Sequence, residues 1–126
     1  MGITQPRILV TGLLLLLTFV SGLGLSRFPR LYNGWLEGVH KLGSLGAIVL
    51  LILLVIKSNR ISALSSLEWT GWLTAGLLFL IAIASGALVS GLKPVPWAML
   101  STHRIAPYFA VLLTAATLYI SFVKAR

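Results

Sequence analysis

His40 and His103 are the side chains whose type and setting could do chemistry in this chain. Ionisable groups inside apolar stretches are costly, which makes them candidates for function. Two imidazoles on opposite faces of a porphyrin hold low-spin b-type haem. Iron–sulfur clusters and thiolate zinc sites are excluded, because the sequence has no cysteine. The pair therefore favours haem b, an iron protoporphyrin, with chlorophyll, which needs one histidine for each magnesium, as the weaker alternative.

Two other interpretations of the histidines stay open at this point. Each imidazole could be neutral and structural, with a hydrogen bond to a hydroxyl such as that of Ser85 or Ser90. A metal ion without a porphyrin is less favoured, because zinc would need further ligands and Glu37 is the only acid near the histidines.

An internal repeat places the two histidines in equivalent positions. Residues 21–42 and residues 85–105 contain the same elements in the same order. These are a Ser-Gly-x-x-x-Ser segment, then a tryptophan, then a histidine followed by a cation and an aliphatic residue. The separations from the first serine to the histidine are 19 and 18 residues. The repeated order predicts a duplicated helical hairpin, in which His40 and His103 lie at one depth.

The elements that position the histidines are membrane-spanning helices. The 126-residue chain is 58% apolar and 10% charged, with a mean hydropathy of +1.01, which excludes a water-soluble enzyme. Its apolar runs are close to or longer than the ~20 residues that cross a bilayer. They predict helices at residues 8–25, 34–56, 69–92 and 96–123. The expected fold is an all-α, integral-membrane, four-helix up-down bundle, a single domain over residues 1–126.

Helix starts are indicated by Asn33, by the capping-box pattern at residues 65–68, and by Pro96. Each histidine follows its helix start by seven residues, which places both about 10 Å along their helices from one membrane face. In an up-down bundle the second and fourth helices are diagonal, about 11–14 Å apart. That spacing suits a flat ligand held between two imidazoles.

Small side chains follow both histidines on their helix faces, at three, four and seven positions beyond each. Such residues could make room for a cofactor, although small stripes also let membrane helices approach closely. Pro107 has no amide for the His103 carbonyl and permits a local bend. The candidate lining residues are Gly43, Ser44, Ala47, Ala106 and Ala110.

The formal net charge of +8 indicates partners at the membrane surface rather than nucleic acid. Five cations on the histidine side are candidate partners for haem propionates, and each alone could equally be an interfacial anchor. Five other cations lie on the side of the termini. When Lys41 and Arg104 are set aside because they lie within helices, the termini side has five cations against three on the histidine side. Because cytoplasmic loops carry an excess of Lys and Arg, this count favours cytoplasmic termini. The candidate propionate partners are Arg27, Arg30, Lys41, Lys93 and Arg104.

Ser21-Gly22-Leu23-Gly24 at the end of the first helix and Glu37-Gly38-Val39-His40-Lys41 at the start of the second resemble the haem A synthase family. The four-helix halves of that family carry an SGL segment and an E-x-x-H-[RK] motif. The resemblance implies that His40 and His103 are axial haem ligands and that Glu37 matches the acid implicated in oxidation chemistry. The chain departs from the family in having four predicted helices instead of eight and no cysteine pair.

The leading hypothesis is a haem-binding membrane electron-transfer protein, a subunit of a larger redox assembly or one half of a homodimer. Two histidines occupy both axial positions of an iron, which favours an electron carrier over an enzyme. The alternatives are a haem A synthase-like oxidoreductase and a structural membrane subunit without a cofactor.

Overall fold

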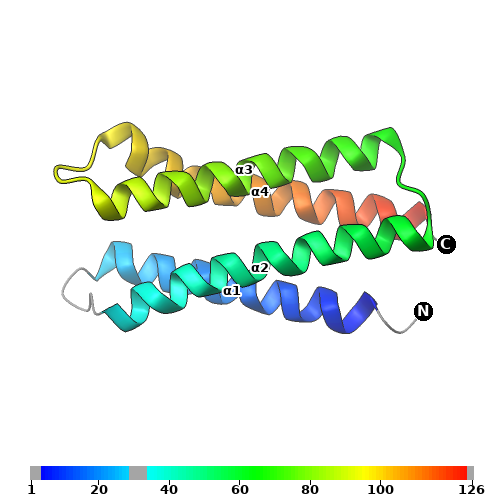
Figure 1. The fold of residues 1–126 in the computed structure, drawn as a ribbon, viewed down its shortest axis with the longest axis horizontal. Helices are drawn as coiled ribbons and strands as arrows, with labels where there is room; N and C mark the ends of the chain where they lie inside the picture. Colours follow the sequence, from blue (N-terminus) through cyan, green and yellow to red (C-terminus); the bar gives the residue numbers. More distant parts are fainter. Residues whose placement is uncertain (1–3, 29–33, 125–126) are drawn as a thin grey trace. The chain divides into compact units, whose positions relative to one another are not determined.

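A computed structural model describes residues 4–28 and 34–124. This part of the chain is all-α and contains no strand. Its four helices, drawn in Figure 1, are α1 Thr4–Arg27, α2 Gly34–Ile61, α3 Ser66–Gly91 and α4 Trp97–Lys124. The predicted all-α class with four helices is therefore confirmed.

All four helices are long and apolar enough to cross a membrane. Large apolar side chains face outward along each of them, as Leu16, Leu53, Leu73 and Leu112 illustrate, so the chain is a multi-pass integral membrane protein whose surroundings are lipid. Each helix extends past its predicted apolar run at one end or both, α2 as far as Ile61. Helical backbone bonds continue there because a membrane helix must satisfy its amides and carbonyls within itself.

The described chain divides into two compact units, Met1–Lys57 and Ser58–Arg126. In the first unit, α1 and α2 form an antiparallel helical pair, here called the first hairpin. Gly24 lies against Leu36 near the turn, and Gly46 lies against Leu14 deeper in the hairpin. Residues later in α2 therefore contact residues earlier in α1, as in an antiparallel pair.

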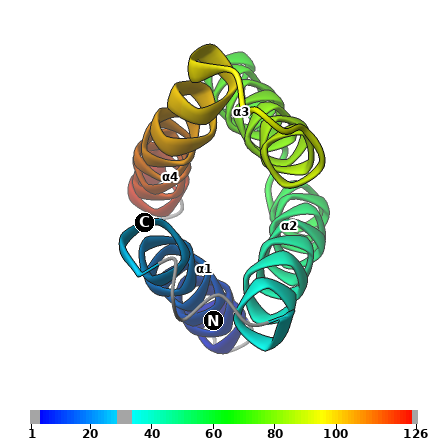
Figure 2. The same ribbon diagram turned by 90° about the vertical axis from the view of Figure 1, so that its left-hand side faces the viewer.

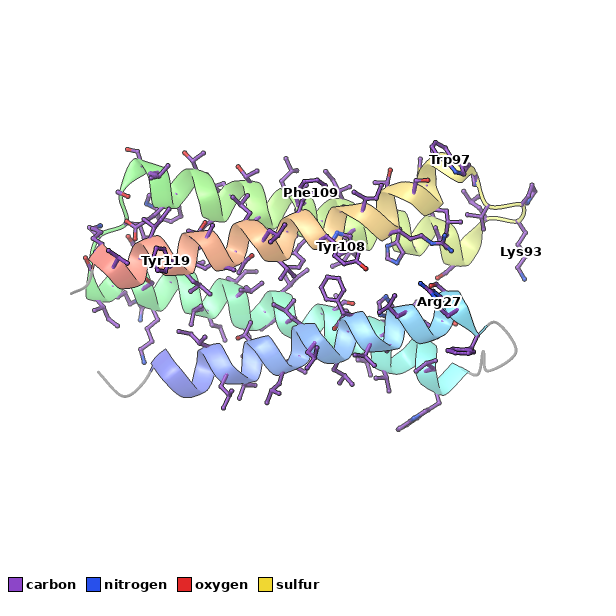
Figure 3. The ribbon with its side chains drawn as sticks, turned by 180° about the vertical axis from the view of Figure 1, so that it is seen from behind. Arg27, Lys93, Trp97, Tyr108, Phe109 and Tyr119 are labelled. Carbon is purple, nitrogen blue, oxygen red and sulfur yellow. The ribbon has the colours of Figure 1, made fainter. Side chains whose placement is uncertain are left out.

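The second unit contains the second hairpin, formed by α3 and α4, which Figure 2 shows side by side when viewed along the helices. Figure 3 places Lys93 and Trp97 at its turn end and Tyr119 near its other end. The predicted capping box is confirmed: the Ser65 hydroxyl accepts the Glu68 amide, and the Glu68 carboxylate accepts the Ser65 amide.

The two hairpins repeat the same pattern of buried positions. In α2 and α4 these positions are 63 residues apart, and in α1 and α3 they are 64 apart. This agreement supports the predicted duplication, because matching side chains face the partner helix in each hairpin. The matching buried pairs are Gly43 and Ala106, Ala47 and Ala110, Leu51 and Thr114, Leu54 and Thr117, Thr11 and Ala75, and Ser21 and Ser85.

Candidate functional site

In the first hairpin, the His40 ring lies against α1. Its Nδ1 atom donates a hydrogen bond to the backbone carbonyl oxygen of Thr18, at 2.9 Å. The Ser21 hydroxyl oxygen is 3.3 Å from the same nitrogen. The imidazole is therefore held by the second half of the preceding helix.

The second hairpin contains the same arrangement. The Nδ1 atom of His103 donates to the backbone carbonyl oxygen of Ala82, at 2.8 Å. Ala82 lies three residues before Ser85, and Thr18 lies three residues before Ser21. Equivalent carbonyls therefore hold the two imidazoles.

These bonds determine where a neutral imidazole carries its hydrogen. A carbonyl oxygen can only accept, so the hydrogen must be on Nδ1 in both rings. The lone pair is then on Nε2, the nitrogen that a metal would take. Metal-binding histidines commonly donate their other ring N–H to a carbonyl in this way, which fixes the tautomer and raises the basicity of the ligand.

Two glycines allow the imidazoles to lie this close to α1 and α3. A Cβ atom built on Gly22 would be 2.8 Å from the Cε1 atom of His40, and one built on Gly86 would be 2.6 Å from Cε1 of His103. Real Cβ atoms essentially never approach closer than 3.0 Å. In the sequence the Ser-Gly pairs mark a repeat, and the first of them also belongs to the family resemblance. Their contact with the histidine rings is a finding of the structure.

The buried serines beside these glycines are bonded within their own helices. The Ser21 hydroxyl contacts the carbonyls of Leu17, at 2.7 Å, and Thr18, at 3.0 Å. The Ser85 hydroxyl donates to the carbonyl of Ile81, at 2.7 Å, and to that of Ala82, at 3.1 Å. The Ala82 carbonyl is the one that also accepts from His103. A structural interpretation of the histidines must therefore involve backbone carbonyls as well as hydroxyls.

Some predicted lining residues serve packing within the hairpins. A Cβ atom on Gly43 would be 2.9 Å from the Thr18 hydroxyl oxygen, so this glycine faces α1. The Ser44 hydroxyl donates to the His40 carbonyl, at 2.7 Å. At the equivalent position α4 has Pro107, which continues the helix without an amide to donate. The small residues Ala47, Ala106 and Ala110 are buried.

The predicted cations differ in their surroundings. Lys41 forms an ion pair with Glu37 one turn earlier on α2, at 2.5 Å, so an acid of this chain already compensates its charge. Arg104 and the turn residues Arg27 and Lys93, which are labelled in Figure 3, are exposed. Arg30 lies outside the described residues.

A buried carboxylate lies at the other end of the second hairpin, far along α3 and α4 from His103. Glu68 is 2% exposed and accepts from the Ser121 hydroxyl, at 2.6 Å, and from the Lys124 ammonium, at 3.0 Å. Lys124 also donates to the Ala63 carbonyl, at 2.7 Å. The capping pattern predicted the Ser65 contacts, but no signal in the sequence indicated the contacts from α4. This cluster joins the ends of α3 and α4.

His40 and His103, one in each hairpin, are the candidate ligands of a cofactor. Among the residues that the structure describes, no three histidine, cysteine or acidic side chains are grouped to hold an ion. A haem iron takes four nitrogens from the porphyrin and needs only axial ligands from the protein.

Comparison of the chain with family models, curated proteins and solved structures finds no match.

Proposed function

We propose that this chain is an integral-membrane electron-transfer protein that binds haem b through two axial imidazoles, His40 from the first hairpin and His103 from the second. The observation that carries the proposal is the repeated bond from Nδ1 to a backbone carbonyl, which leaves the lone pair of each neutral ring on Nε2.

Electron transfer is the activity that this ligation supports. A bound haem would supply a one-electron iron couple. His40 and His103 would both hold the haem iron, which would then serve electron transfer and not the binding of oxygen or a substrate. The membrane helices that carry the histidines exclude water, and fixed ligands reduce the rearrangement that accompanies a change of charge.

Charged groups at the turn ends complete the proposal. The propionates of haem need water or cations, and exposed Arg27, Lys93 and Arg104 could provide the latter. Lys41 contributes less, because Glu37 holds its ammonium group. We further propose that the chain works with other membrane redox subunits or with a second copy of itself, with its termini in the cytoplasm.

Single replacements of the two histidines test the proposal. His40→Ala and His103→Ala should each abolish the low-spin, six-coordinate haem spectrum of the purified protein, since one imidazole cannot maintain it. Thr102→Ala, at an exposed position beside His103, is the matched control and should keep the spectrum. If both histidine variants kept an unchanged reduced spectrum, the proposed ligation would be wrong.

A further inference from the structure

In both hairpins a Ser-Gly segment, Ser21-Gly22 or Ser85-Gly86, places its glycine against the histidine ring and bonds its serine to the carbonyl that accepts from that ring. We propose that each segment is a positioning device that fixes the rotation of its imidazole, so that Nε2 is the only nitrogen able to coordinate iron. This inference rests on the proposed function and deepens it. The glycines and serines are positioning residues, since they act through the histidines.

The glycines contact the same edge of each ring. From a Cβ atom built on Gly22, the distances to Cε1, Nδ1 and Nε2 of His40 are 2.8, 3.2 and 3.7 Å. From one built on Gly86, the distances to the same atoms of His103 are 2.6, 3.0 and 3.3 Å. The Cε1–Nδ1 edge is therefore against the glycine in both hairpins, and Nε2 is the more distant nitrogen.

The hydrogen bond selects one of the two orientations that a flat ring could adopt in this space. Turning the His103 ring over would place a carbon where Nδ1 now donates to the Ala82 carbonyl, and that bond would be lost. The same holds for His40 and the Thr18 carbonyl. The buried serines bond to these same carbonyls, which keeps the acceptors within the helix that faces each ring.

A single methyl group should disturb this arrangement. Ordinary contact for a Cβ atom begins at 3.4 Å, so Gly86→Ala requires the His103 ring to retreat by about 0.8 Å from its 2.6 Å approach. A retreat along the hydrogen bond would lengthen it from 2.8 Å to about 3.6 Å, which is no longer a hydrogen bond. For Gly22→Ala the retreat is about 0.6 Å, enough to weaken the bond from His40 in the same way.

The first experiment needs no haem. Nitrogen-15 NMR of the haem-free protein in detergent micelles, with labelled histidines, should show hydrogen on Nδ1 of both rings. Gly86→Ala should shift the His103 signals and leave those of His40 unchanged, and Gly22→Ala should do the reverse. The unaffected histidine reports that the other hairpin is folded. A wild type with hydrogen on Nε2 would overturn the inference even if neither variant folded.

Two glycines in the same helices provide matched controls. Gly12 in α1 and Gly76 in α3 have open space where a Cβ atom would be added. Gly12→Ala and Gly76→Ala should therefore leave both sets of histidine signals unchanged. If these controls moved the signals as much as Gly22→Ala and Gly86→Ala do, contact with the ring would not be the cause.

The second experiment uses the haem-loaded protein. Gly22→Ala and Gly86→Ala should each weaken haem retention by about tenfold or more and shift the g-values of the ferric low-spin haem, as loss of a ligand's supporting bond does elsewhere. Haem binding by both variants as in the controls would overturn the inference. A protein with both Nδ1 hydrogens in place that binds no haem would instead refute the proposed function and leave the positioning role standing.

Discussion

Gly43 contacts Thr18 in the first hairpin, and the second hairpin has different residues at the two equivalent positions. Replacing the first pair of residues by the second tests whether the two hairpins pack alike. A Cβ atom on Gly43 would be 2.9 Å from the Thr18 hydroxyl oxygen, about 0.5 Å inside ordinary contact at 3.4 Å. That hydroxyl cannot move freely, because it donates to the Leu14 carbonyl at 2.8 Å. The second hairpin has alanine at both equivalent positions, Ala106 and Ala82.

The structure therefore predicts compensation between two substitutions. Gly43→Ala should lower the free energy of unfolding by about 1–3 kcal/mol through overpacking. Thr18→Ala removes the obstructing hydroxyl, so the double variant should recover most of this loss and reproduce the alanine pair of the second hairpin. The coupling between the two substitutions should be about 1–2 kcal/mol.

The measurement is reversible unfolding in mixed detergent micelles, followed by circular dichroism, for the wild type and the three variants. Alanine also favours a helix over glycine by up to about 1 kcal/mol, and this gain must be measured separately. Gly38→Ala in the same helix supplies it, since nothing lies within 4 Å of the added atom. The reasoning would be refuted if Gly43→Ala stabilised the protein as much as Gly38→Ala does.

Two further predictions concern the two acidic residues of the chain. Glu68→Gln should lower the free energy of unfolding by about 1–3 kcal/mol, because a neutral amide replaces the buried carboxylate that accepts from Ser121 and Lys124. The same unfolding assay checks this prediction, and an unchanged midpoint would contradict it. Glu37→Gln should retain haem and raise its midpoint potential in a redox titration, since it removes a negative charge one turn from His40. Formation of haem A by wild type supplied with haem O, lost in Glu37→Gln, would show an enzyme instead of a carrier.

Hydropathy and local capping predicted the helices well, because both depend on neighbouring residues. The ends of the apolar runs give the helix positions to within a few residues, and Ser65 caps α3 as its pattern indicates. The spacing of Glu37 and Lys41 on one helix face could also have predicted their ion pair. Lys41 stays a predicted propionate partner, one whose charge Glu37 compensates in this structure.

Contacts between helices could not be predicted in the same way. Gly22 of α1 contacts the imidazole of His40, and Gly43 of α2 contacts the hydroxyl of Thr18. Both residues are glycines, so the residue type alone does not distinguish the two contacts. The carbonyls that accept from the histidines belong to residues of unrelated type, Thr18 and Ala82, because a backbone acceptor is independent of the side chain. Only the packing of the two helices reveals them.

The central claim is that His40 and His103 together hold one haem, and an absorption spectrum of the purified protein tests it most directly. Oxidised and dithionite-reduced samples should show a six-coordinate, low-spin b-type haem, with one haem for each chain by pigment extraction. A purified, folded protein with no Soret band after reconstitution with haem, or with only a five-coordinate, high-spin spectrum, would contradict the claim.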